Sequence, residues 1–390
     1  MKFISAFIVA AVVTVPAFAR VPARPFVLSE ASNTFGIQSL GLLFKEQGQK
    51  NVVYSPLSAH LALSMLANGG RNNTGEQMLS ILDIPTHEQA FANQQVLKLI
   101  GTLTSRPKGE LTLMLANGVW TTPGAPIKAD YARIVKHNFK GEVTALESAE
   151  QINAWAARNT NNLITKVIDD IGGLEMILAN ATYFKADWTL PFKKSVEGSF
   201  QTLNAGTTTA DMMDKQDTLK HAVYQQYEAV ELTYGPSALA SMILILPTRA
   251  DRFVAARDQL NEHTLTQILA AVQQAEPAYG AVKMPKFEFK TSFKMNEALI
   301  AMGMRDAFTN SADFSALSDA FLKVSFVKQD AVIKVHEKGT EAAAVTAIGM
   351  ERTSIDPTPK FSFVADRPFI YVIRDNETGV ILFVGQVVSP

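Results

Sequence analysis

The 390-residue chain contains no cysteine, and its charges nearly cancel, with 36 basic against 37 acidic side chains. The absence of cysteine excludes disulfide bonds, thiol nucleophiles and thiolate metal ligands. Because the formal net charge is −1, no overall attraction favours a nucleic acid or an anionic membrane. We therefore expect no nucleic-acid partner and no membrane partner, and a fold stabilised by its apolar core.

Long apolar runs are also missing, except at the N-terminus. There Lys2 is followed by an apolar stretch at residues 3–15 and by the small-residue pattern Ala17-Phe18-Ala19. A basic start, a short apolar stretch and an A-x-A site are typical of a secretory signal peptide. The sequence predicts a signal peptide at residues 1–19 that is removed, and export of the mature chain to the periplasm or the extracellular space.

Catalytic motifs are absent as well. None of the six histidines lies in an H-E-x-x-H pattern, and the sequence holds no G-x-S-x-G, P-loop or G-x-G-x-x-G motif. We therefore assign no catalytic residue, no metal site and no cofactor, and we expect a protein that is not an enzyme. A serine–histidine–aspartate site assembled from distant residues stays open as a remote alternative.

What the chain does contain is enough apolar material for a large core, since 47% of its residues are hydrophobic and 19% are charged. Apolar periodicity predicts helices at residues 29–45, 75–82, 88–103, 128–139, 150–167, 260–273 and 292–302, and a further helix that starts at Pro56 after the cap Ser55 and is terminated by Gly69-Gly70. Alternating or continuous apolar runs predict strands at residues 51–54, 111–121, 174–184, 227–232, 240–246, 282–289, 324–335, 369–374 and 380–388. Without an internal repeat or a flexible linker, residues 20–390 are expected to form one α+β domain.

One segment between two predicted strands is unusual in composition: EKGTEAAAVTAIGMERTSIDP, at residues 337–357. In an extended conformation, alternate residues from Thr340 to Ile348 lie on one face that carries no charge, while Glu341 lies on the other face. Such a segment suits pairing inside a sheet. Composition alone favours the simpler interpretation, an exposed flexible loop of small residues.

Short motifs follow one another in a fixed order from residue 29 to the C-terminus. They are Asn51 with Ser55-Pro56 and Ser58; Ile152-Asn153 with Trp155; Leu178-Ala179-Asn180-Ala181 with Tyr183-Phe184-Lys185 and Trp188; Met284-Pro285-Lys286-Phe287; Ala312-Asp313-Phe314-Ser315; Phe363 with Ala365-Asp366-Arg367-Pro368-Phe369; and Ile381-Leu382-Phe383-Val384-Gly385. By these motifs the chain resembles the serpins, a family of serine protease inhibitors. The resemblance implies three β-sheets, about eight or nine helices, and an exposed reactive-centre loop at about residues 337–360.

The resemblance also implies a function for the unusual segment. Its first part is similar to the hinge of inhibitory serpins, with hinge residues Glu337, Gly339, Thr340, Glu341, Ala342, Ala343, Ala344 and Thr346. In such inhibitors a target serine protease cleaves the loop as a suicide substrate, forms an acyl-enzyme and is trapped when the loop inserts into the central sheet. We expect a monomer whose target is trypsin-like or elastase/subtilisin-like, with a cysteine protease as a further option. The alternative is a non-inhibitory serpin with a binding, carrier or chaperone role.

The bond that the protease attacks has three candidates. Counted from the hinge threonine in the common loop length, the bond is Thr353-Ser354. One residue earlier, Arg352-Thr353 presents the loop's arginine to a trypsin-like pocket, and side-chain chemistry slightly favours this bond. Met350-Glu351 is a distant third.

The resemblance places a further group of residues where the central sheet opens. They are Ser55, Ser58, Asn180, Trp188 and Gln329. Gln329 stands where many serpins have a histidine. Because an amide both donates and accepts hydrogen bonds, we expect the gating function to survive, while its pH dependence is in doubt.

Overall fold

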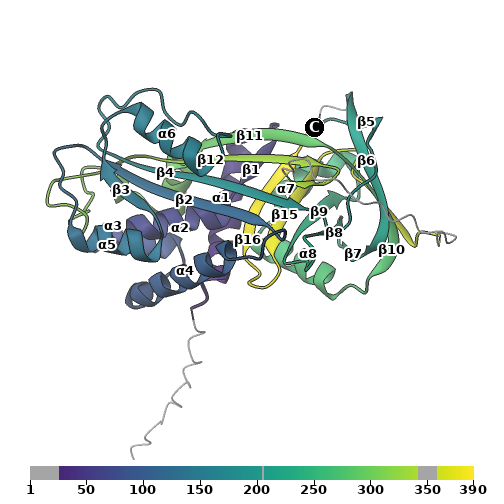
Figure 1. The fold of residues 1–390 in the computed structure, drawn as a ribbon, viewed down its shortest axis with the longest axis horizontal. Coiled ribbons are helices and arrows are strands. Elements are labelled where there is room, and N and C mark those ends of the chain that lie inside the picture. The colour runs from purple at the N-terminus through teal and green to yellow at the C-terminus, as the bar shows by residue number, and fades with distance from the viewer. Residues whose placement is uncertain (1–25, 204–205, 341–357) are drawn as a thin grey trace, which may run out of the picture.

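Three β-sheets and nine α-helices make up the part of the chain that the computed structural model describes, residues 26–203, 206–340 and 358–390. Figure 1 shows them as one elongated body. This arrangement confirms the predicted α+β fold. The predicted reactive-bond residues Arg352, Thr353 and Ser354, and the hinge residues 341–346, lie outside the described residues.

The helices have the following bounds: α1 (Leu28–Gln47), α2 (Pro56–Ala67), α3 (Asn72–Ile81), α4 (Gln89–Thr104), α5 (Ala129–Asn138), α6 (Ala149–Asn159), α7 (Phe253–Gln259), α8 (Glu262–Gln274) and α9 (Asn296–Met302). Among the described residues, no helix combines the length and the apolarity needed to cross a bilayer.

The strands form three sheets, in each of which consecutive strands of the following series are hydrogen-bonded neighbours. Sheet A contains β11 (Phe287–Lys294), β12 (Val324–His336), β13 (Gly339–Thr340), β4 (Met176–Asp187), β2 (Thr112–Thr121) and β3 (Glu142–Ala145). Sheet B contains β1 (Val52–Tyr54), β16 (Ile381–Val387), β15 (Phe369–Asp375), β9 (Ala240–Pro247), β8 (Tyr227–Tyr234) and β7 (His221–Tyr224). Sheet C contains β14 (Phe361–Val364), β10 (Ala278–Pro285), β6 (Thr207–Leu219) and β5 (Val196–Gln201).

Helix α2 lies in the centre of the molecule. Its N-terminus is capped by Ser55, whose Oγ accepts a hydrogen bond from the Ser58 amide at 3.4 Å, and Pro56 occupies the first helical position. Every residue of α2 is buried, as expected for a helix that is apolar around most of its circumference. The helix contacts β2 and β4 of sheet A and β16 of sheet B. Its capped end is therefore held against the inner face of sheet A.

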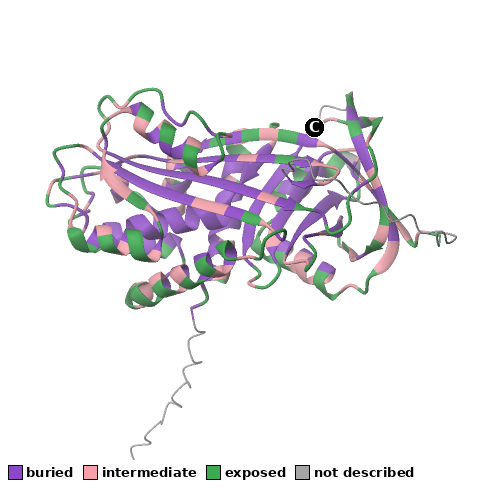
Figure 2. Ribbon diagram, in the orientation of Figure 1, coloured by how far each residue is buried: buried purple, intermediate pink, exposed green. Residues whose placement is uncertain are grey.

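A second, smaller apolar core lies on the outer face of sheet A, beneath α6. Trp155 of α6 packs edge-on against Trp120 of β2, with ring centroids 4.9 Å apart. The segment after α6 contributes Val167 and Ile168 to this core, and β4 contributes Ala181. Figure 1 shows α6 on one side of sheet A and α2 on the other, and in Figure 2 the strands between them are largely buried. Sheet A is thus covered on both faces.

Two predicted helices are wrong in extent. Helix α6 ends at Asn159 rather than at residue 167, because Asn161 and Asn162 adopt positive φ angles of 49° and 62°, which a right-handed helix does not permit. Residues 292–294 of the other helix belong to β11, since Ser292 pairs with Asp330 of β12. The sequence also does not predict β5 and β6, where polar residues obscure the alternation typical of strands.

Candidate functional site: the division of the central sheet

Sheet A divides between β4 and β12. These two strands pair directly and in parallel up to the rung that joins Ala331 to Thr182. Beyond this rung they separate, and β13 lies between them, antiparallel to both: Thr340 pairs with Val335 of β12 and with Ala186 of β4. The residues that form β13 are the first part of the predicted hinge. We call this point, where two paired strands become three, the fork.

The hinge residues at the fork are buried, although the sequence predicts an exposed loop from residue 337 onward. Thr340 is 2% exposed, and its Oγ1 lies 2.7 Å from the hydroxyl of Tyr234. Gly339 leaves no room for a side chain, because a Cβ there would lie 2.2 Å from the carbonyl oxygen of Ala186. Thr340 therefore points into the core, in agreement with the uncharged face that the sequence assigns to it.

Trp188 holds the turn that leads into β13. Its backbone amide donates to the carbonyl of Lys338 at 2.8 Å, and its Nε1 donates to the carbonyl of His336 at 3.0 Å. The indole stacks on the ring of Tyr234, with centroids 4.2 Å apart and an interplanar angle of 12°. Trp188 and Tyr234 together form an aromatic base under the hinge.

Glu337 anchors the same turn by its charge. Its carboxylate accepts a hydrogen bond from the Ser195 amide at 3.3 Å and lies 3.4 Å from the Nζ of Lys286. Partial burial raises the pKa of Glu337, but hydrogen bonds from its own backbone and from Ser195, together with Lys286, outweigh burial and lower this pKa to about 2. The carboxylate is therefore ionised across the neutral and mildly acidic range, and the hinge turn is held by an ion pair.

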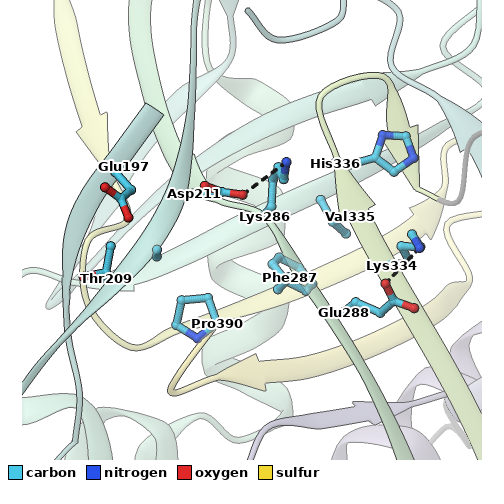
Figure 3. A pocket seen from close by; sticks show the side chains of 11 residues that line it. Glu197, Thr209, Asp211, Lys286, Phe287, Glu288, Lys334, Val335, His336 and Pro390 are labelled. Atoms are coloured by element: carbon cyan, nitrogen blue, oxygen red, sulfur yellow. Dashed lines mark ion pairs between the residues drawn. The ribbon is translucent and has the colours of Figure 1, made fainter. Parts of the chain in front are cut away.

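A cavity of about 490 Å³ borders this ion pair. Two ion pairs line it: Lys286 lies 3.3 Å from Asp211, and Lys334 lies 2.9 Å from Glu288. Figure 3 shows both pairs as dashed lines. His336 and the C-terminal Pro390 also line it. The outer side of the hinge turn is therefore accessible to solvent, while its inner side rests on Trp188.

Substitution Glu337→Gln should weaken the hinge turn. Because the folded-state pKa lies below the ordinary value of 4.5, the carboxylate stabilises the fold above pH 4.5, and this stabilisation is lost as the pH falls toward 2. We expect the variant to lose about 2 kcal/mol of unfolding free energy at pH 7 and to equal the wild type near pH 2. Urea unfolding at both pH values measures this, with the exposed pair member Glu288→Gln as control. An equal difference at both pH values would contradict the assignment.

A group of polar side chains lies farther along β4 and β12, on the inner face of the sheet, and holds the paired part of the two strands together. We call this group the locking cluster. The Gln329 side chain accepts from the Ser55 amide at 2.9 Å and donates to the Ser55 carbonyl at 3.0 Å and to Asn180 Oδ1 at 3.1 Å. Asn180 Nδ2 in turn donates to the hydroxyl of Ser58 and to Asn117 Oδ1, the latter at 2.7 Å. Gln329 and Asn180 face each other on one rung of the ladder. The cluster thus joins both strands to the capped end of α2.

The structure brings together four of the five residues predicted for the sheet-opening region. Ser55, Ser58, Asn180 and Gln329 form this locking cluster, whereas Trp188 lies at the hinge turn, directly after the end of β4. The amide of Gln329 makes three hydrogen bonds without any ionisable group, so this part of the lock carries no titrating side chain.

Sequence reasoning missed five partner residues: Asn117 and Thr182 in the locking cluster, and Ser195, Tyr234 and Lys286 at the hinge turn. Thr182 had a usable signal, because it follows Asn180 by two residues on a strand and therefore shares its face; its hydroxyl donates to Ser58 Oγ at 2.6 Å. Tyr234 and Lys286 had none, since they come from β8 and from the link between β10 and β11.

Comparison with known proteins agrees with this geometry. The family model described as Serpin (serine protease inhibitor) matches residues 30–390. The chain belongs to the serpin family. An uncharacterized serpin-like protein of Thermococcus kodakarensis is 33% identical over 364 residues, which cover 89% of this chain and 83% of that protein. Serpin-Z10 of Arabidopsis thaliana is 30% identical and covers 87% of this serpin and 92% of its own length.

Solved serpin structures are similar over nearly the whole chain. Human thyroxine-binding globulin, in complex with thyroxine, has a TM-score of 0.84 and 26% identity, covering 93% of this serpin and 98% of that chain. Tengpin, a thermophilic serpin in its native state, has a TM-score of 0.83 and 28% identity, covering 95% and 96% of the two chains. The family supports a function of the protease-inhibitor type in general, since serpins act mostly as inhibitors rather than as catalysts.

Proposed function

We propose that this serpin inhibits a serine endopeptidase as a suicide substrate and is not a catalyst. The observation that carries the proposal is the fork: Gly339 and Thr340 already pair between β4 and β12, and the strands continue beyond them. In this register, an extension of β13 to residue 344 or beyond must separate β4 from β12. The proposed mechanism needs this geometry, because the cleaved loop must enter the sheet from the end where the hinge lies.

The locking cluster also fits this mechanism, because it would resist premature insertion of the loop into the sheet. The distance from Val335 to Gln329 along β12 is six residues, so the residue six positions after Thr340 would reach the rung of Gln329 and Asn180. In this register Thr346 would meet the locking cluster, and it belongs to the uncharged face that begins at Thr340. An entering strand would therefore present small or β-branched residues to the core along this distance.

Energetics support the proposal in order of magnitude. A strand of about a dozen residues gains hydrogen bonds on both sides, at roughly 0.5–1.5 kcal/mol net each, in addition to side-chain burial. The total is on the order of 10–20 kcal/mol. A gain of this size is sufficient to distort the catalytic site of a tethered protease, provided that the uncleaved form is kinetically trapped.

The target and the cleaved bond follow from the loop sequence. We propose Arg352-Thr353 as the cleaved bond with a trypsin-like protease, and Thr353-Ser354 with an elastase- or subtilisin-like protease as the second choice. We further propose that the protein acts as an exported monomer, after removal of residues 1–19, in the periplasm or the extracellular space.

Incubation of residues 20–390 with trypsin-, elastase- and subtilisin-like proteases tests the proposal. We expect a covalent complex on a denaturing gel with one of them, and a released C-terminal peptide that begins at Thr353 or at Ser354 by mass spectrometry. The same protease with its catalytic serine blocked is the control and should give neither product. Cleavage of the loop without a covalent complex and without a gain in heat stability would instead support a non-inhibitory carrier, a role to which thyroxine-binding globulin gives a precedent by its complex with thyroxine.

A further inference from the structure

Asp330 is a buried charge next to the fork that its neighbours compensate only in part. It is 1% exposed, and among the described residues its carboxylate oxygens have no partner in good hydrogen-bond geometry, although the Ser292 side chain, opposite it on β11, lies close enough to lower its pKa. It follows Gln329 on β12 and therefore points to the opposite, outer face of sheet A. Across the ladder it pairs with Ala181 of β4, which belongs to the apolar core beneath α6. A carboxylate is thus enclosed on the outer face of the sheet, between this apolar core and the lysine side chains of β11 and β12.

The cations nearby do not compensate for this burial. Lys328 and Lys290 lie 3.9 and 4.0 Å from the carboxylate oxygens, beyond hydrogen-bond distance. Lys328 already donates a hydrogen bond to the carbonyl of Val167, in the segment that covers the sheet after α6. Burial raises the pKa of Asp330, and the opposing effects of Lys328, Ser292 and Lys290 do not restore it. Ionised Asp330 therefore destabilises the folded state.

Because of the position of Asp330, its buried charge acts on the pairing of β12 with β4. The last rung between β12 and β4 joins Ala331 to Thr182, and the next joins Asp330 to Ala181. Deeper insertion of β13 must break these two rungs before it reaches Gln329. Two consecutive residues of β12 therefore act in opposite senses: Gln329, on the inner face, is fully hydrogen-bonded and holds the strands together, whereas Asp330, on the outer face, weakens the rung above it.

We propose that Asp330 is a positioning residue for sheet opening, whose buried charge loosens the β4–β12 pair and its cover after α6, and so accelerates insertion of the loop. The same residues also allow the opposite role, because Asp330 lies among Lys328, Lys290 and Lys294 and reduces their mutual repulsion. The two roles predict changes of opposite sign in the stability of the folded state when the charge of Asp330 is removed.

Substitution Asp330→Asn decides between them, since the amide keeps the shape and removes the charge. We expect the thermal midpoint at pH 7 to rise by roughly 2–4 °C. The folded-state pKa lies above the ordinary value, so the wild type loses stability as the pH rises past about 4, and the gap between variant and wild type should close at pH 3. Glu288→Gln is the matched control: it removes one negative charge from the same sheet, at an exposed side chain, and should leave the midpoint unchanged.

Hydrogen exchange and insertion kinetics complete the test. In Asp330→Asn we expect slower exchange of the backbone amides at residues 176–182 and 324–331, and slower trapping of the protease by roughly three- to tenfold. The second readout rests on the proposed function, whereas the midpoint and the exchange rates need no protease and decide the role of Asp330 even if no protease is trapped. An unchanged or lowered midpoint overturns the proposal, and so does a raised midpoint without slower exchange.

Discussion

Substitution Thr340→Arg should abolish inhibition while leaving the protein cleavable by its target protease. Thr340 is 2% exposed and contacts the Tyr234 hydroxyl, and burial raises the pKa of that tyrosine well above its ordinary range. A guanidinium cannot be accommodated there without a partner, because an unpaired buried charge is far less stable than a solvated one. The hinge should therefore leave the fork, and insertion after cleavage should stop at its first residue.

The measurement is the number of inhibitor molecules consumed for each protease molecule trapped. We expect this number to rise at least about tenfold in Thr340→Arg, which corresponds to about 1.4 kcal/mol or more in the competition between trapping and release. Thr340→Val is the matched control, since it keeps the shape and removes only the hydrogen bond to Tyr234. It should trap the protease nearly as well as the wild type. Stable complexes of Thr340→Arg at wild-type yield would show that insertion through the fork is not the mechanism.

Substitution Gln329→Leu should unlock the sheet. It leaves the buried amide of Ser55 without a partner and removes one hydrogen bond each from the Ser55 carbonyl and from Asn180 Oδ1. The carbonyl keeps the amide of Ala59 as a donor, and the Oδ1 keeps the hydroxyl of Thr182. An unsatisfied buried amide costs about 1–3 kcal/mol and each of the two lost hydrogen bonds roughly 0.5–1.5 kcal/mol, so the folded state should lose on the order of 2–6 kcal/mol. Because Gln329 joins β12 to Asn180 of β4 and to the cap of α2, the loss should also favour spontaneous insertion of the intact loop into the sheet.

Two readouts separate these effects. We expect a lower midpoint in urea, and on incubation at 37 °C a gradual conversion to a form that is heat-stable but no longer inhibits. Gln201→Leu, at an exposed position on β5, controls for the change of side chain and should show neither effect. Gln329→His keeps one donor and one acceptor and should give an intermediate result. A wild-type midpoint together with lasting inhibition by Gln329→Leu would remove the cluster from the gating mechanism.

Much of the fold follows from local signals in the sequence. Ser55 and Pro56 mark the start of α2 by cap chemistry, and the apolar runs of β9, β15 and β16 identify strands buried on both faces. The extent of α6 could not be found in this way, because its end depends on the left-handed conformations of Asn161 and Asn162. For β6, polar alternation gives no contrast between faces, and only pairing with β5 and β10 identifies the strand.

In the candidate site, too, local patterns can be predicted from the sequence and long-range contacts cannot. The alternation of residues from Thr340 onward predicts which face is uncharged, and the buried side chain of Thr340 agrees with it. The partners that hold the hinge cannot be predicted, because they are distant in the sequence and meet the hinge only through the packing of sheets B and C against sheet A. Tyr234 contacts Thr340, while Lys286 and Ser195 contact Glu337. Asp330 is hidden for a related reason, since its burial depends on the segment that covers the sheet after α6.

The antiparallel position of β13 between two parallel strands also determines how such an inhibitor is used up. Each rung that opens between β4 and β12 exchanges one ladder of hydrogen bonds for two, so no stopping point favours a return to the starting state. On the proposed mechanism every encounter with the protease therefore consumes a molecule permanently. The amount of protease that can be inhibited would then depend on the rate at which new chains are synthesised, and not on a binding equilibrium.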